Sequence, residues 1–178
     1  HAKKALDELS MRAWYLHADA QGKYFFQNIK NLIAELNSLV DSYTNENAKK
    51  ELKTLLEEKF KPVVGDCYQK AEVFPALDEI KLSEDKVSLI LFEPYPIGGL
   101  HPDLLEFYKN TRYKNRVAFL SGSKNTMDNL YRSAKEYKAI QSIIIRMRED
   151  AVPESNQQFQ RAMEKLHKIT LNVLQSAR

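Results

Sequence analysis

The chain has 178 residues, 43% of them hydrophobic and 29% charged, which is long enough for one well-buried core and short for two. This is the composition of an ordinary globular protein, and no apolar run approaches the ~20 residues that span a bilayer, so we expect no transmembrane segment. Cys67 is the single cysteine, which excludes an intrachain disulfide and favours a reducing, cytoplasmic location.

The first 27 residues predict a short helix and then two aromatic-rich strands. RAWYLH and KYFFQ are separated by ADAQG, in which Gly22 is the expected turn residue. A helix followed by a two-stranded ribbon is how a winged-helix domain ends. The chain also begins without Met and ends inside a helical pattern. We therefore expect residues 1–27 to be the C-terminal helix and wing of a truncated winged-helix-like unit, and 28–178 to be an α/β module.

Two amphipathic helices are predicted next. Asn28 is a candidate N-cap, and apolar residues follow it at helical spacing as far as Tyr43. After the polar TNEN, a second apolar stripe runs from Ala48 to Phe60 and is ended by Pro62. The following stretch, GDCYQKAEVFPALDEIKLSED, predicts only short extended pieces and a turn.

The middle of the chain carries the clearest α/β pattern. KVSLILFEPY (86–95) and RVAFLSG (116–122) predict strands, and HPDLLEFYKNTR (101–112) predicts a helix between them, with Pro102 suited to its first position. Strand, helix and strand in this order predict a parallel βαβ unit with a right-handed crossover. Both strands are apolar without alternation, which is expected when both faces of each are covered.

The last third of the chain predicts two long helices. One apolar stripe runs from Met127 to Ile144, a break follows at 150–155, and a second stripe runs from Phe159 to Leu174. The predicted fold class is therefore α/β. It comprises a small parallel βαβ core flanked by long amphipathic helices, preceded by an N-terminal helix and β-hairpin.

The segment SGSKNT (121–126) lies between the second strand and a helix, where α/β proteins often bind phosphate. A P-loop needs Gly-x-x-x-x-Gly-Lys-Ser/Thr, and this segment has one glycine, Gly122. Amides at the helix start could hold an anion, but the simpler interpretation is that Ser123 or Asn125 caps the helix. The four histidines are scattered, and none is close to another or to Cys67. We therefore predict no catalytic residue, no metal site and no cofactor.

Basic residues are concentrated between Lys109 and Lys138, where eight basic residues stand against two acidic ones, a net charge of +6 in a chain of net charge +3. Basic and aromatic residues together at a βα edge could hold a nucleic-acid backbone. The alternatives are a solvated face or a contact surface for an acidic neighbouring domain. The candidate nucleic-acid-binding residues are Lys114, Arg116, Lys124, Arg132 and Lys135.

Three ordered segments carry a family resemblance: GKYFFQNIKNL, FPALDEIKLSEDKVSLILFEPYPIGGLHPDLLEFY and YKNRVAFLSGSKNTMDNLYRSAKEYKAI. They resemble the downstream part of large predicted AAA+-type ATPases of prokaryotes, of uncharacterised function. These proteins are similar to the P-loop ATPases of the BREX and phage-growth-limitation defence systems. The resemblance covers most of residues 12 to 148.

The resemblance implies a role without catalysis for this chain. The Walker A loop of the family has no match here, and LILFEP is similar to a Walker B strand only in placing Glu93 after apolar residues. The expected function is an accessory or regulatory domain of a large AAA+-type ATPase, which contacts the rest of the parent chain, a protein partner or DNA, and no membrane. The alternative is a nucleic-acid-binding module that uses residues 109–138.

Overall fold

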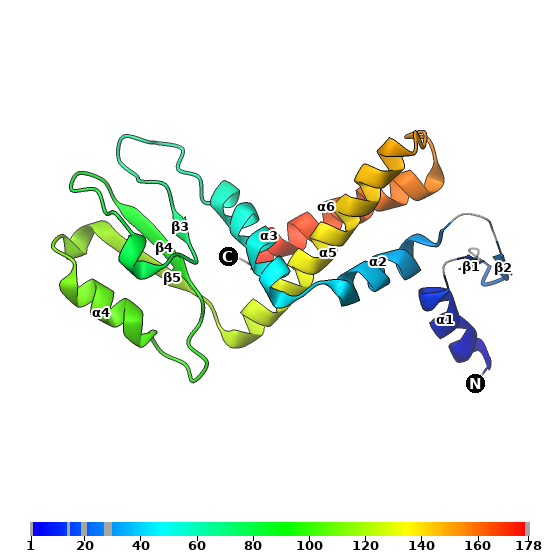
Figure 1. Ribbon diagram of the computed structural model, residues 1–178, viewed down its shortest axis with the longest axis horizontal. Coiled ribbons are helices and arrows are strands. Elements are labelled where there is room, and N and C mark those ends of the chain that lie inside the picture. The colour runs from blue at the N-terminus through cyan, green and yellow to red at the C-terminus, as the bar shows by residue number, and fades with distance from the viewer. Residues whose placement is uncertain (1, 14, 19–20, 27–29, 177–178) are drawn as a thin grey trace. The chain divides into compact units, whose positions relative to one another are not determined.

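The computed structural model describes residues 2–13, 15–18, 21–26 and 30–176 of the chain (Figure 1). The fold is mixed α/β, as predicted. Packing divides the chain into two compact units, which are described separately below. Unit 1 comprises residues 1–48 and 133–173, and unit 2 comprises residues 49–132 and 174–178. The predicted domain boundary after residue 27 stays a prediction.

Unit 1 begins with the predicted helix and hairpin. Helix α1 (Ala2–Arg12) precedes strands β1 (Leu16–Ala18) and β2 (Tyr24–Phe26). The two strands pair antiparallel, with His17 opposite Phe25. The helix and hairpin are therefore confirmed, whereas their origin in a winged-helix domain stays a prediction.

Helix α2 (Leu32–Ser42) follows the hairpin and is capped by Asn31. The Asn31 side chain accepts a hydrogen bond from the Ile33 amide at 3.0 Å and donates one to the Leu16 carbonyl at 2.6 Å. One buried amide thus caps the helix and attaches it to the hairpin. The predicted cap, Asn28, lies outside the described residues.

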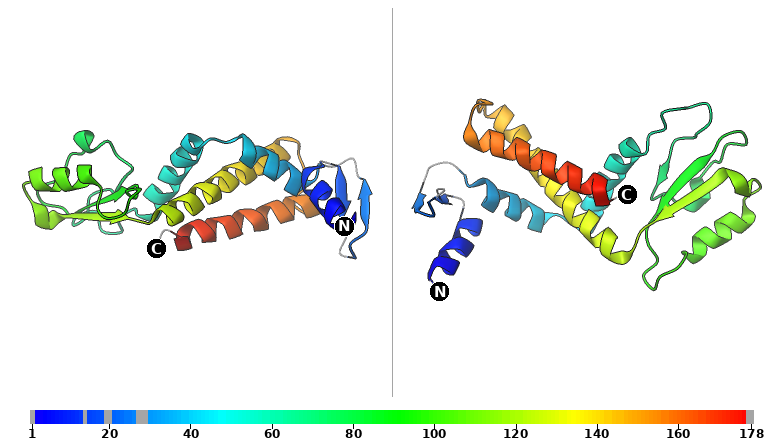
Figure 2. Two further views of the ribbon diagram at one scale, coloured as in Figure 1. Left: turned by 90° about the horizontal axis from the view of Figure 1, so that it is seen from below. Right: turned by 180° about the vertical axis from the view of Figure 1, so that it is seen from behind.

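The core of unit 1 is formed by three helices. Helix α5 (Lys124–Glu149) and helix α6 (Gln157–Ser176) run side by side in Figure 1 and in both views of Figure 2, and α2 packs against them. Each helix has the apolar stripe that the helical spacing predicted, and in the structure the three stripes meet. The buried residues of this core are Leu32, Leu36, Ala139, Ile140, Ile143, Ile144, Phe159, Ala162 and Ile169.

Unit 2 is built on a three-stranded parallel sheet of order β3-β4-β5. Strand β4 (Ser88–Phe92) lies in the centre, and helix α4 (Pro102–Asn110) connects it to β5 (Val117–Ser121). The predicted parallel βαβ pairing is confirmed. Strand β3 (Glu72–Val73) lies in the stretch for which the sequence predicted only short extended pieces.

Helix α3 (Asn45–Lys59) begins in unit 1 and contributes most of its length to unit 2. A short 3₁₀ turn, Leu77–Glu79, follows β3, and a second one, Lys114–Arg116, precedes β5. The Gln69 side chain links the long connection between β3 and β4 to strand β4. Its amide nitrogen donates to the Lys81 carbonyl at 2.7 Å, and its oxygen accepts from the buried Ser88 hydroxyl at 2.7 Å.

The expectation that both strands of the βαβ unit are covered on both faces is wrong for β5. Ile90 and Leu91 of β4 are buried, whereas Ala118, Leu120 and Ser121 of β5 are exposed. Strand β5 lies at the sheet edge and pairs with β4 alone among the described residues. Helix α4 covers one of its faces in part, where Phe119 meets Phe107 edge-on at a centroid distance of 6.3 Å.

Candidate functional site

Glu93 lies directly after β4, at the carboxyl edge of the parallel sheet. Lys49 of α3 donates a hydrogen bond to its carboxylate at 2.7 Å, and the Tyr131 hydroxyl of α5 donates a second one. The Lys49 ammonium also lies 5.7 Å from the centre of the Phe74 ring. The Glu93 carboxylate therefore connects three segments of unit 2.

The surroundings of Glu93 also decide its charge. Partial burial opposes ionisation, but the hydrogen bonds from Lys49 and Tyr131 and the charge of Lys49 outweigh it. The pKa of the Glu93 carboxyl therefore lies below its ordinary value. A lowered pKa makes the carboxylate a weaker base, and a general base works best with a pKa near the operating pH.

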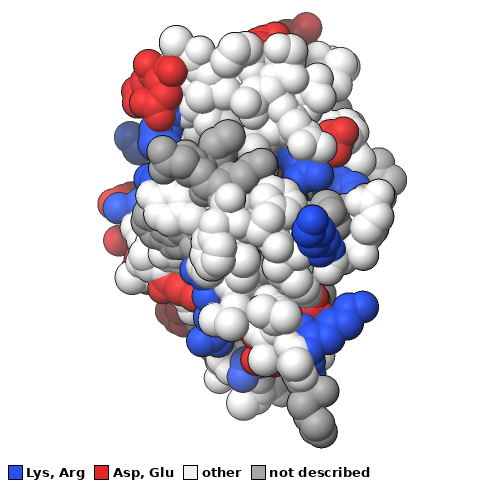
Figure 3. Space-filling model, turned by 90° about the vertical axis from the view of Figure 1, so that its right-hand side faces the viewer, with Lys and Arg blue, Asp and Glu red and all other residues white. Residues whose placement is uncertain are grey.

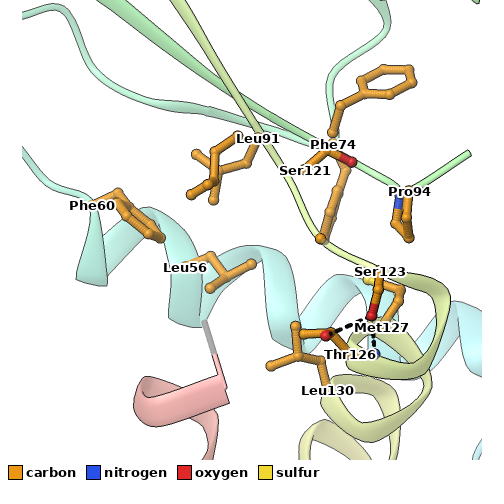
Figure 4. Close-up of a pocket in the computed structure, with 13 residues that line it drawn as sticks. Leu56, Phe60, Phe74, Leu91, Pro94, Ser121, Ser123, Thr126, Met127 and Leu130 are labelled. Atoms are coloured by element: carbon orange, nitrogen blue, oxygen red, sulfur yellow. Dashed lines mark hydrogen bonds between the residues drawn. The ribbon is translucent and has the colours of Figure 1, made fainter. Parts of the chain in front are cut away.

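A pocket of about 250 Å³ lies beside the carboxyl ends of β4 and β5 (Figure 4). Open parallel sheets commonly bind ligands at this edge. Most of the lining is apolar and comes from α3, the strand ends and the start of α5: Leu56, Phe60, Phe74, Leu91, Phe92, Pro94, Leu120, Ser121, Gly122, Ser123, Thr126, Met127 and Leu130.

Two polar side chains of this pocket, those of Ser123 and Thr126, bond to each other within the chain. The Ser123 hydroxyl accepts a hydrogen bond from the Thr126 amide at 3.2 Å and lies 2.9 Å from the Thr126 hydroxyl, as Figure 4 shows. Ser123 therefore caps α5, which confirms the capping interpretation. A Cβ at Gly122 would lie 3.6 Å from Thr126, an ordinary contact, and Gly122 has no left-handed φ. Glycine is therefore not required here by the geometry, as it would be in a loop that wraps a phosphate closely.

The structure brings together only two of the five predicted nucleic-acid-binding residues. Lys114 and Arg116 lie in the 3₁₀ turn at the amino end of β5. Lys124 is the first residue of α5, beyond the carboxyl end of β5; a five-residue strand separates the two places by roughly 16 Å. Arg132 lies two turns further along α5 and is exposed, and Lys135 belongs to unit 1. Their binding of nucleic acid stays a prediction.

Lys114 and Arg116 belong to a basic and aromatic cluster that we define by five residues: Tyr108, Arg112, Tyr113, Lys114 and Arg116. The guanidinium groups of Arg112 and Arg116 lie 5.2 and 5.5 Å from the centre of the Tyr113 ring. The Lys114 ammonium lies 5.8 Å from the Tyr108 ring. These distances fit cation–π contacts, which hold the cations in place while Arg112 and Lys114 stay exposed.

An acidic pair lies next to this cluster. Nη1 of Arg112 lies 3.9 Å from Oε1 of Glu84. The pKa of Asp85 is lowered chiefly by a hydrogen bond from Ser83, with a further contribution from the charge of Arg116. Nothing local in the sequence indicates that the loop before β4 reaches the turn before β5. These acids offset part of the positive charge of the cluster.

The other polar candidates have structural roles. The His101 side chain accepts a hydrogen bond from the Asp103 amide at 3.2 Å and caps α4, while its ring meets Phe92 and Tyr95 edge-on. Asp78 lines a hollow with Asp103, and neither Glu93 nor His101 is among the residues that line it. His17 is buried in β1 and stacks on Phe25.

Neither a metal-binding cluster nor a membrane-spanning helix is found in the described residues. No group of three or more His, Cys, Asp or Glu side chains in them could hold a metal ion. No helix among them is both long and apolar enough to cross a membrane. On the face of the molecule shown in Figure 3, Lys and Arg side chains are interspersed with Asp and Glu rather than gathered into one basic patch.

Comparison of the chain with protein-family models, with curated proteins and with solved structures finds no match. The function is therefore inferred from the geometry of unit 2.

Proposed function

We propose that this chain is a non-catalytic accessory module of a larger cytoplasmic AAA+-type ATPase, which acts through contacts with protein or DNA. The observation that carries the proposal is the hydrogen bonding of Glu93, the residue at the position similar to that of a Walker B acid. Lys49 and Tyr131 donate hydrogen bonds to its carboxylate, which leaves it engaged within the chain. The sequence segments that resemble the downstream part of such ATPases, and their lack of a Walker A loop, give the proposal its further support.

The proposal predicts that the purified chain hydrolyses no ATP. A coupled phosphate-release assay is expected to give the same background rate for the unchanged chain and for the Glu93→Gln variant. The reason is that the Glu93 carboxylate bonds to Lys49 and Tyr131 and does not activate a water molecule for attack on ATP. Glu84→Gln serves as the control, because Glu84 is an exposed acid of the same unit. Turnover that Glu93→Gln abolishes and Glu84→Gln preserves would overturn the proposal.

Nucleic-acid binding is the second candidate function. The observation that favours it is the cluster of Tyr108, Arg112, Tyr113, Lys114 and Arg116, in which three cations, two of them exposed, lie over aromatic rings. Such groups can contact phosphates and stack on unpaired bases. The neighbouring Glu84 and Asp85 weaken this candidate, because they repel a phosphate backbone.

A salt series measures this second candidate directly. If Lys114, Arg116 and Arg132 contact phosphates, changing all three to Gln reduces the slope of log K against log salt for duplex DNA by about 2 to 3, since each lost contact removes ~0.9. Fluorescence anisotropy with labelled duplex and single-stranded DNA is the measurement. The matched control changes three exposed lysines of the same unit, Lys50, Lys59 and Lys61, to Gln. Equal slopes for the two triple variants would contradict contacts at the predicted residues.

A further inference from the structure

Strand β5 presents an open and unprotected sheet edge. It pairs with β4 on one side, and its backbone has no hydrogen-bond partner on the other side among the described residues. Edge strands are usually protected by a charge, a proline or a bulge. The five residues of β5, VAFLS, contain no charge and no proline, and they pair with β4 in unbroken register.

The two ends of this edge are basic. Lys114 and Arg116 precede β5, and Lys124 follows it. Neither Lys114 nor Lys124 forms an ion pair with a described residue. Glu84 and Asp85 offset part of the charge of Arg112 and Arg116, so Lys114 and Lys124 are the cations left for a ligand. An uncharged strand with one such cation at each end is complementary to an extended peptide that is apolar in its middle and acidic at its ends.

The side chains on both faces of β5 also suit an added strand. Leu120 is 38% exposed on the face that it shares with Leu91, so an apolar side chain beside it would cover it. On the other face Phe119 is half-buried against Phe107 and Tyr108. Side chains that neighbour each other across paired strands pack together, so the partner gains apolar contacts on both faces of the sheet.

Charge disfavours a second copy of this chain as the partner. In an antiparallel pair of β5 strands, Lys114 and Arg116 of one copy would approach Lys124 of the other. In a parallel pair, each of these cations would approach its own equivalent. Like charges directly opposite each other destabilise a strand pair, so both arrangements are unfavourable.

We propose that the open edge of β5 binds an extended acidic peptide segment of a protein partner, which adds to the sheet as a fourth strand. Main-chain hydrogen bonds would supply affinity in this mode, and the alternating side chains and the terminal charges would supply specificity. The proposal rests on the contact function proposed above and gives that function a partner.

The test uses a labelled probe peptide, Asp-Glu-Val-Thr-Val-Thr-Val-Asp-Glu, with the whole chain. Anisotropy is expected to report binding that weakens as salt rises, and a peptide with Lys in place of each Asp and Glu is expected not to bind. Amide hydrogen exchange is expected to slow in residues 117–121 when the acidic peptide is present, because the outward peptide groups gain partners.

Two variants locate the binding. Leu120→Glu places an acid on the edge and is expected to weaken peptide binding by about tenfold or more, whereas Leu105→Glu, at a similarly exposed leucine of α4, leaves it unchanged. Lys114→Gln combined with Lys124→Gln tests the terminal charges without touching the strand and is expected to weaken binding and its salt dependence.

Besides a failure of the peptide to bind, three outcomes would overturn the proposal. These are equal binding of the acidic and basic peptides, binding without protection of residues 117–121, and protection of those residues by self-association without peptide. Failure of the peptide to bind refutes this inference alone. ATP turnover that depends on Glu93 refutes the proposed function instead, whatever the peptide does.

Discussion

We expect replacement of Arg146 by Met to lower the free energy of unfolding by about 3 kcal/mol, the low end of what breaking a buried ion pair removes. Arg146 of α5 donates two hydrogen bonds to Glu35 of α2, one of them at 2.8 Å. The Glu35 side chain is 6% exposed and that of Arg146 is 36% exposed. The variant therefore leaves a carboxylate in an apolar helical core without its cation, and the exposure of Arg146 sets the value at the low end.

Urea denaturation followed by circular dichroism measures the loss. The double variant with Arg146→Met and Glu35→Leu is expected to recover most of it, because no buried charge then lacks a partner. Arg161→Met is the control, since Arg161 is an exposed arginine of α6 in the same unit. A double variant no more stable than Arg146→Met would show that the loss comes from packing of the arginine stem rather than from the stranded carboxylate.

This ion pair illustrates what the sequence could not predict. The spacing of apolar residues predicted α2, α5 and α6, because helix periodicity is a local property of the chain. The partners Glu35 and Arg146 are 111 residues apart, and neither has a local feature that indicates burial. The bonds of Lys49 and Tyr131 to Glu93 span 44 and 38 residues and were missed for the same reason.

The sheet also has features that the sequence could not predict. Strands β4 and β5 were predicted with their parallel pairing, since both are apolar runs on either side of a short helix. Their burial was not predictable, because it depends on strand order: β4 lies between two neighbours and β5 between one neighbour and solvent. The two-residue strand β3 has no pattern of its own and exists through its pairing with β4.

We expect Ile90→Ala to be the most damaging single truncation in the sheet of unit 2, with a loss of about 3 kcal/mol in the free energy of unfolding. Ile90 lies in the central strand, pairs with Glu72 of β3 and Phe119 of β5, and is 0% exposed. Removal of three buried carbon atoms there opens a cavity that neither neighbouring strand can fill without losing its register. Because whole domains are stable by only about 5–15 kcal/mol, such a loss is a large fraction of the total.

Two further variants test this explanation. Ile90→Val removes a single methyl group and is expected to lose about 1 kcal/mol. Ile97→Ala truncates a side chain that is 84% exposed and is expected to lose less than about 0.5 kcal/mol. Urea denaturation gives the three values, and hydrogen exchange in residues 88–92 and 117–121 shows where the structure loosens. If Ile90→Ala lost no more than Ile97→Ala, the three-stranded sheet could not be the core that positions Glu93 and the open edge of β5, and both functional proposals would lose their scaffold.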